Sequence, residues 1–407
     1  MTDSITLRKH SVLLGIATTL PSSKSISNRV LIINALANGG SSLHNLSDAN
    51  DTQLMLRLVN SSSAEIDVED AGTTMRFLTA YFTVNNQQKI MTGSHRMKER
   101  PIGILVDALR SLGADIEYLG IDGYPPHRLK GFPKQKTNAI KIRGDVSSQY
   151  ISALMMVGPK LPQGLSLELE GKIGSRPYIE MTASLMRQFG VQLDFTGNKI
   201  KIEPQQYKAT EYTVESDWSG ASYWYSFAAL AEKAEIVLPR IALTSLQGDR
   251  AIADIAEQFG VISTAGPNQT ITLTKGSSKN ELRWDFTHCP DLAQTVAVIC
   301  AAKGIKGFFT GLESLRIKET DRIAALQNEL RKIGADLIED DPAHWRLIPS
   351  TSLPKKASFN TYKDHRMAMA FAPLATLIDE VEIENPAVTR KSYPTFWEDV
   401  KGMGFAT

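Results

Sequence analysis

Hydrophobic and polar positions repeat one arrangement at four places along the chain. In each, an apolar helical pattern ends at a glycine and an alternating strand pattern follows at once, in the segments LRSLGADIEYLG, LMRQFGVQLDFTG, IAEQFGVISTAG and LRKIGADLIED. The glycines are Gly113, Gly190, Gly260 and Gly334, and Gly404 continues the series, with intervals of 77, 70, 74 and 70 residues. Chance is the alternative, because glycine often ends helices. The near-constant period favours a duplicated α/β unit of roughly 68 residues, of which six fill the chain.

Between these segments the pattern predicts further helices, each of which opens with small, hydroxyl or charged residues. They cover residues 25–38, 73–82, 147–157, 221–231, 292–302 and 366–378. The stretches SLELEG and NKIKIEP alternate as strands do. A chain of 407 residues exceeds one ordinary core, so two domains are expected. The change from an extended segment to a helix in SDWSGASYWYSF places their boundary near residue 217.

Composition narrows the class of protein. The 45 basic and 44 acidic residues nearly cancel, which argues against a nucleic-acid or membrane-surface protein. The cysteines are Cys289 and Cys300, and neither lies in a CxxC pair or a histidine cluster, so two reduced thiols are expected rather than a zinc site or a disulfide. The first residues show no signal-peptide pattern, and no apolar run approaches 18 residues, so a cytoplasmic protein is expected.

The segment SLRIKETDRIAAL concentrates charge just before an apolar helical stripe. Thr320 or Asp321 could cap the helix, in which case the charges only solvate its start. Lys318 and Arg322, however, lie four residues apart, and cations are unfavourable at a helix N-terminus unless an anion binds there. The segment alone leaves both interpretations open.

Similar cationic and hydroxyl groups recur at other expected helix starts, in both halves of the chain. Each could be a solvated loop or a cap, but together they suit a cleft that binds phosphate and carboxylate groups. The candidates are Lys24, Ser25, Arg29, Gly72, Arg96, Ser147, Ser148, Gln149, Ser175, Tyr178, Lys318, Arg322, Arg366 and Lys391.

Two carboxylates are candidates for proton transfer. Asp291 in CPDLAQT and Glu319 in KETDR lie near these cations, although a cap and a surface ion pair are the respective alternatives. The chain contains no GxxxxGK[ST], no GxGxxG after a strand and no HExxH. The usual signals of nucleotide hydrolysis, dinucleotide redox chemistry and zinc proteolysis are therefore missing.

Taken together, these segments resemble the 5-enolpyruvylshikimate-3-phosphate synthases of the enolpyruvyl transferase family. The likeness runs from Leu20 to Pro394 through PSSKSISNR, AGTTMRFL, TGSHRMKERPIG, SSQYISALMM, SRPYIE, QGDRAIAD, PDLAQT, RIKETDRIAAL, YKDHRMAM and TRKSYP. It implies an α/β fold of two similar domains, each of three βαβαββ units with the helices inward and the sheets outside. The first domain would cover residues 20–216, the second residues 1–19 and 217–407, with the active site in the cleft between them.

The resemblance also implies a reaction, in which the enolpyruvyl group of phosphoenolpyruvate passes to the 5-hydroxyl of shikimate 3-phosphate and phosphate leaves through a tetrahedral intermediate. It implies no metal or organic cofactor and no nucleic-acid or membrane partner, and a monomer is expected. Asp291 would take the hydroxyl proton and Glu319 the methylene proton, with Lys24 as a rival donor. Shikimate 3-phosphate would contact Ser25, Arg29, Ser147, Ser148, Ser175, Tyr178 and Lys318. Phosphoenolpyruvate would contact Lys24, Gly72, Arg96, Gln149, Arg322, Arg366 and Lys391.

Four positions depart from the family pattern: Ser22, Asp70, Phe77 and Ser314. An aspartate about 6 Å from a bound phosphate would cost on the order of 3 kcal/mol, unless Asp70 instead caps the next helix. The sequence predicts neither sensitivity nor resistance to glyphosate, because Gly72 and Thr73 match the sensitive members of the family and Phe77 does not. The alternatives are a UDP-N-acetylglucosamine enolpyruvyl transferase, whose usual reactive cysteine has no counterpart before residue 289, and a non-catalytic anion-binding relative.

Overall fold

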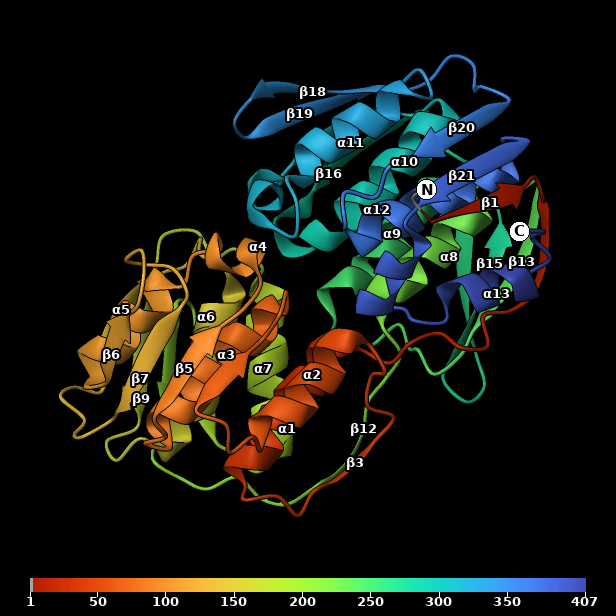
Figure 1. Ribbon diagram of the computed structural model, residues 1–407. Coiled ribbons are helices and arrows are strands. Elements are labelled where there is room, and N and C mark those ends of the chain that lie inside the picture. Colours follow the sequence, from red (N-terminus) through yellow and green to blue (C-terminus); the bar gives the residue numbers. More distant parts are fainter. Residues whose placement is uncertain (1–2) are drawn as a thin grey trace. The chain divides into compact units, whose positions relative to one another are not determined.

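The computed structural model describes residues 3–407, which form two compact units (Figure 1). One, called here the N-terminal unit, is Lys24–Val214. The other, the C-terminal unit, joins the described residues up to Ser23 to Glu215–Thr407. The chain therefore crosses between the units twice, and the boundaries expected at residues 20 and 217 lie close to these crossings.

Four sheets share one topology, in which two parallel neighbouring strands are followed by an antiparallel pair. In the N-terminal unit these are β4 (Glu65–Asp67), β5 (Lys89–Thr92), β7 (His127–Gly131) and β6 (Asp115–Tyr118), and β8 (Ala139–Arg143), β9 (Leu165–Glu170), β11 (Lys199–Ile202) and β10 (Leu193–Thr196). In the C-terminal unit they are β2 (Val12–Ile16), β13 (Lys233–Leu238), β15 (Thr270–Lys275) and β14 (Val261–Gly266), and β16 (Glu281–Asp285), β17 (Lys306–Thr310), β19 (His344–Ile348) and β18 (Asp336–Asp341).

A smaller sheet completes each unit. Strand β12 (Glu211–Thr213) runs parallel to β3 (Ser42–His44) in the N-terminal unit. In the C-terminal unit β21 (Glu380–Glu384) lies between β20 (Lys356–Phe359) and β1 (Ser4–Arg8). The first two strands of the chain thus pair with strands of the C-terminal unit, β1 with β21 and β2 with β13.

Helices buried along most of their length form the centre of each unit, and the sheets lie outside them (Figure 1). They are apolar on nearly every face, as a helix surrounded by protein must be. In the N-terminal unit these are α3 (Gly72–Val84) and α6 (Ser148–Val157), against which α1 (Lys24–Leu36) packs. In the C-terminal unit they are α8 (Trp218–Leu230), α10 (Ala293–Lys303) and α12 (His365–Phe371).

The remaining helices are α2 (Asn50–Val59), α4 (His95–Lys98), α5 (Gly103–Leu112), α7 (Arg176–Gln188), α9 (Ala251–Glu257), α11 (Arg322–Arg331) and α13 (Phe396–Gly402). The glycine pattern is confirmed, because α5, α7, α9 and α11 each precede a hairpin strand. Their glycines, Gly113, Gly190, Gly260 and Gly334, have φ values of 125°, 85°, 75° and 77°. Glycine adopts such angles more easily than residues that have a Cβ atom.

The expectation of one helix over residues 366–378 was wrong. Helix α12 ends at Phe371, and a 3-10 helix, η6 (Ala372–Thr376), follows it. Pro373 accounts for the break, because proline has no N–H to donate to the preceding turn. Across residues 3–407, no helix is long and apolar enough to cross a membrane.

Candidate active site

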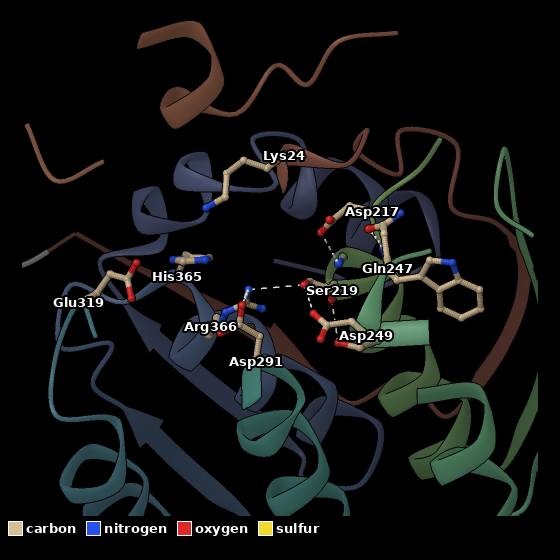
Figure 2. Close-up of polar contacts among 12 residues, drawn as sticks. Lys24, Asp217, Ser219, Gln247, Asp249, Asp291, Glu319, His365 and Arg366 are labelled. Atoms are coloured by element: carbon tan, nitrogen blue, oxygen red, sulfur yellow. Dashed lines mark hydrogen bonds and ion pairs between the residues drawn. The ribbon is translucent and has the colours of Figure 1, made fainter. Parts of the chain in front are cut away.

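The N-terminal ends of the three central helices meet in the C-terminal unit, and Arg366 links them (Figure 2). From the first turn of α12 its Nη2 donates to Asp291 Oδ2 at 2.8 Å and to Ser219 Oγ at 3.4 Å. Its Nη1 donates to the hydroxyl of Tyr223 at 3.3 Å. Ser219 and Tyr223 belong to α8, and Asp291 lies in the 3-10 helix η4 (Pro290–Leu292) that leads into α10.

Arg322 joins the same group from α11 and contacts three carboxylates. Its Nε donates to Asp364 Oδ2 at 2.7 Å, Nη1 to Asp291 Oδ1 at 3.0 Å and Nη2 to Glu319 Oε2 at 2.8 Å. The guanidinium side chain is only 2% exposed. Burial alone would lower its pKa, but the three carboxylates outweigh burial and raise it. The three carboxylates therefore keep the buried Arg322 guanidinium charged.

Both candidate proton-transfer carboxylates lie in this group. Asp291 is one-fifth exposed, and burial would raise its pKa, but the fields of Arg366, Lys318 and Arg322 outweigh burial and lower it. Glu319 accepts from Arg322 and forms an ion pair with Lys391 Nζ at 3.4 Å. Four cations therefore interact with Asp291 or Glu319: Lys318, Arg322, Arg366 and Lys391. The sequence analysis had listed all four as candidates for a cationic site.

Of the two interpretations of SLRIKETDRIAAL, the structure confirms the cap but not that the charges only solvate the helix start, because Arg322 is buried; anion binding stays a prediction. Asp321 caps α11, because its Oδ1 accepts from the backbone N–H groups of Ile323 and Ala324 at 3.1 Å each. The cap leaves Arg322, the first helical residue, to turn inward. Asp291, in contrast, is not the cap of α10, whose N-cap residue is Leu292.

Asp249 is a buried carboxylate of this site that the sequence analysis missed. It lies in the 3-10 helix η2 (Gly248–Arg250), is 2% exposed, and accepts a short hydrogen bond from the Ser219 hydroxyl (Figure 2). Burial first, and then the charge of Asp291, raise its pKa to about 7. Asp249 lies in QGDRAIAD, one of the stretches that resemble the family, but no sequence pattern indicated that it is buried.

In the N-terminal unit the predicted residues also lie at helix starts. Lys24 is the first residue of α1, and its Nζ contacts Asp51 Oδ2 at 3.0 Å. The starts of α3 and α6 are adjacent, since Gln149 Nε2 donates to Thr73 Oγ1 at 3.0 Å. Ser147 is the N-cap of α6, with Ser148 as its first residue. Backbone N–H groups and helix dipoles at these starts favour a bound anion.

Gly72 opens α3 beside the guanidinium of Arg100. A Cβ atom at Gly72 would lie 2.6 Å from Arg100 Nη2, closer than any normal contact. Arg100 Nη1 in turn donates to the backbone carbonyl of Asp70 at 3.3 Å. A side chain at position 72 would therefore displace the Arg100 guanidinium.

Arg29 is almost fully enclosed between α1, α6 and α7. It donates to Thr182 Oγ1 at 2.7 Å, to Ser152 Oγ at 3.2 Å and to the backbone carbonyls of Ser25 and Tyr178 at 2.9 and 3.4 Å. Burial lowers its pKa to about 10. The guanidinium carbon also lies 5.4 Å from the centre of the Phe77 ring, so Phe77, which departs from the family pattern, packs against a residue that is predicted to contact substrate.

Arg96, Ser175 and Asp70 complete the positions of the N-terminal unit that the sequence analysis singled out. Arg96 on α4 pairs with Glu99 Oε2 at 3.0 Å and is 38% exposed. Ser175 precedes α7 with a left-handed φ of 50°. The alternative that Asp70 caps α3 was wrong, because the N-cap is Ala71 and the Asp70 carboxylate accepts from the Ser94 hydroxyl.

Residues 3–407 contain no group of three or more His, Cys, Asp or Glu side chains that could hold a metal ion. Cys289 and Cys300 are buried, unpaired in a disulfide, and have pKa values raised by burial, to about 12 for Cys289. The expected reduced thiols are therefore present and poorly nucleophilic.

Comparison with known proteins gives the same family along nearly the whole chain. The model of the EPSP synthase (3-phosphoshikimate 1-carboxyvinyltransferase) family matches residues 8–70 and 57–400. The chain belongs to the EPSP synthase family. A 3-phosphoshikimate 1-carboxyvinyltransferase of Bacteroides fragilis is 47% identical over 393 residues, which cover 95% of this chain and 94% of that protein. One of Neisseria gonorrhoeae is 38% identical over 426 residues, which cover 98% of both chains.

Solved structures support the fold expected of an EPSP synthase. Two structures of EPSP synthase from Acinetobacter baumannii match all of this chain and all of their own, with TM-scores of 0.78 and 0.80 at 20% and 19% identity. The two-domain enolpyruvyl transferase fold, with its helices inside and sheets outside, is confirmed.

Proposed function

We propose roles for the residues described above in the EPSP synthase reaction. The chain transfers the enolpyruvyl group of phosphoenolpyruvate to shikimate 3-phosphate and releases phosphate, a step of the shikimate pathway. The observation that supports these roles is the position of Asp291. It lies just before α10, accepts hydrogen bonds from Arg322 and Arg366, and shares Arg322 with Glu319.

Shikimate 3-phosphate is assigned mainly to the helix starts of the N-terminal unit, because its phosphate dianion suits their N–H groups and hydroxyls. The hydrogen bonds of Arg29 to its own unit support a second task, in which it fixes the starts of α6 and α7 around the ligand. The proposed contacts are Ser25, Arg29, Ser147, Ser148, Ser175, Tyr178 and Lys318.

Phosphoenolpyruvate is assigned to cations, because it carries a carboxylate and a phosphate. Arginines can bind both groups in a bidentate manner, whereas Lys24 and Lys391 serve as point charges. Gly72 and Gln149 would supply close backbone approach and an amide donor. The proposed contacts are Lys24, Gly72, Arg96, Gln149, Arg322, Arg366 and Lys391.

Proton transfer is assigned to Asp291 and Glu319. Asp291 would take the proton of the 5-hydroxyl as its oxygen attacks C2 of phosphoenolpyruvate, while protonated Glu319 gives a proton to C3. As the C2–O bond to phosphate breaks, Glu319 would take a proton back from C3 and Asp291 would pass the hydroxyl proton to the departing phosphate. The cations lower the pKa of Asp291 in the free protein. When substrate anions bind to the same cations, they compensate that field, and the pKa of Asp291 rises when proton transfer is needed. Lys24 is the rival proton donor.

These roles divide one reaction between groups of two units, so substrate binding must bring those groups to the same molecules. We expect closure on shikimate 3-phosphate, and small-angle scattering that shows no compaction would contradict it. The chain is proposed to act as a monomer, and a sedimentation mass of twice 44.8 kDa would contradict this.

The test of the proposed function is phosphate release from phosphoenolpyruvate, with and without shikimate 3-phosphate. Release should require shikimate 3-phosphate, should not occur with UDP-N-acetylglucosamine, and should fall about 100-fold or more in Glu319→Gln. Glu313→Gln, an exposed change in the same segment, is the matched control and should leave release unchanged. Binding of shikimate 3-phosphate without any release would identify a non-catalytic relative.

A further inference from the structure

The two segments by which the chain leaves the C-terminal unit are joined to each other before they part. Ser23 N donates to the carbonyl of Glu215 at 2.8 Å, and Asp217 N donates to the carbonyl of Pro21 at 2.8 Å. Ser22 and Ser216 form an antiparallel bridge between them. The next residue after Ser23 begins the N-terminal unit, and Glu215 is the first residue after it.

One buried side chain, Gln247, is bonded to both segments. Its Oε1 accepts from Ser23 Oγ at 2.9 Å and from the backbone N–H of Trp218 at 3.1 Å. Its Nε2 donates to Glu215 Oε1 at 2.9 Å and to the carbonyl of Ser216 at 2.8 Å. The residue is 6% exposed, and these four bonds use both donors and both acceptor positions of the amide.

The bonded atoms lie next to Lys24 and next to Ser219, which contacts Arg366, and the proposed function uses both Lys24 and Arg366. Ser23 directly precedes Lys24, and Trp218 directly precedes Ser219, which donates to Asp249 and accepts from Arg366. Asp249 itself lies two residues after Gln247. Figure 2 shows Gln247 with Asp217, Ser219 and Asp249 around the start of α8. If the Gln247 amide shifts, both crossing segments shift with it.

We propose that Gln247 is a positioning residue for the reaction, because its amide fixes the register of the two crossing segments. This inference rests on the role proposed for Lys24. With the amide in place, motion between the units begins beyond Ser23 and Glu215, so the residues directly before Lys24 and Ser219 are held in fixed positions. Misplacement of a catalytic group by about 1 Å can cost about 100-fold in rate, which makes such a fixed point valuable.

The chemistry of the amide distinguishes this role from simple filling of space. A glutamate at 247 has nearly the same shape, but it cannot donate and would face the carboxylate of Glu215 at hydrogen-bond distance. A glutamine at 215 could then donate to it. Gln247→Glu should therefore separate the two segments, and the double change Gln247→Glu with Glu215→Gln should rejoin them in part, because it restores the bond to residue 215 but not the bond to the Ser216 carbonyl.

The experiment measures kcat/KM for phosphoenolpyruvate together with the Kd of shikimate 3-phosphate. Gln247→Glu should lower kcat/KM by about 30-fold and change the Kd by less than about 3-fold, and the double variant should recover part of the loss, at least about 3-fold. Glu329→Gln is the stability control, because Glu329 is a buried residue of the same unit that accepts from Asn360 N and Tyr362 OH far along the chain. It should lower unfolding stability without the fall in kcat/KM.

Hydrogen exchange supplies a readout that does not depend on activity. In Gln247→Ala, the amides of Ser23 and Trp218 should exchange at least about 10-fold faster, while those of β5 keep their wild-type rates. The proposal is overturned if kcat/KM in Gln247→Glu stays within about 2-fold of wild type, if the double variant recovers nothing, or if exchange at these amides is unchanged. If wild type releases no phosphate but the exchange result holds, the proposed function fails and the structural role of Gln247 stands.

Discussion

Asp249→Asn should stabilise the C-terminal unit, and the gain should depend on pH. The Asp249 carboxyl is buried and close to Asp291, and its pKa is raised to about 7 from an ordinary 3.8. Asparagine has nearly the same size, and its Oδ1 can still accept from the Ser219 hydroxyl. The substitution thus removes the charge and keeps the packing.

The sign follows from the protons that each state binds. Between pH 4 and pH 7 the folded protein holds a proton on Asp249 that the unfolded chain has lost, so wild-type stability falls as the pH rises through that window. At about 1.4 kcal/mol per pKa unit, the full effect is about 4 kcal/mol above pH 7. The burial of the carboxamide offsets part of this, so the variant should gain at least about 2 kcal/mol at pH 8 and close to nothing at pH 4.

Tryptophan fluorescence during urea unfolding measures this directly, because all five tryptophans belong to the C-terminal unit. The difference between variant and wild type is measured from pH 4 to pH 8. Asp254→Asn is the control, since its carboxylate pairs with Arg250 at the surface and should change stability by less than about 0.5 kcal/mol. A gain that does not vary with pH, or a loss of stability at pH 8, would refute the reasoning.

Two further variants test the two units separately. Arg322→Met leaves Asp291, Glu319 and Asp364 without their shared cation, so the free energy of unfolding of the C-terminal unit in urea should fall by about 3–5 kcal/mol. Arg331→Met removes an exposed ion pair and should lower it by less than about 1 kcal/mol. Equal effects of the two changes would contradict this reasoning. Gly72→Ala must displace the Arg100 guanidinium, so it should raise the KM for phosphoenolpyruvate about 10-fold. Gly402→Ala is the control, because its Cβ meets nothing within 4 Å, and it should leave the KM unchanged. An unaltered KM in Gly72→Ala would show that Gly72 is not part of the proposed site.

The sequence predicted features that depend on neighbouring residues. The glycines after α5, α7, α9 and α11 were visible because a helix end, a left-handed residue and a strand follow one another locally. The cap of α11 by Asp321 was one of two candidates for the same reason. Pro373 had a known effect on helices, yet the apolar pattern across it concealed the break.

Features that depend on distant residues could not be read in this way. Asp364 meets Arg322 across 42 residues, and the raised pKa of Asp249 follows from burial by elements far along the chain. Arg29 was predicted as a ligand contact from its place at a helix start, but its hydrogen bonds to Thr182 and Ser152 appear only once α6 and α7 pack beside it. Its contact with shikimate 3-phosphate stays a prediction.

The central claim is that Asp291 takes the proton of the 5-hydroxyl while Arg322 and Arg366 hold it in place. The most direct test compares phosphate release by wild type and Asp291→Asn at saturating phosphoenolpyruvate and shikimate 3-phosphate, with the Kd of shikimate 3-phosphate measured for both by calorimetry. The account predicts a Kd within about 5-fold and release lower by at least about 100-fold, since the amide cannot accept the proton. Release within about 3-fold of wild type would show that Asp291 is not the base.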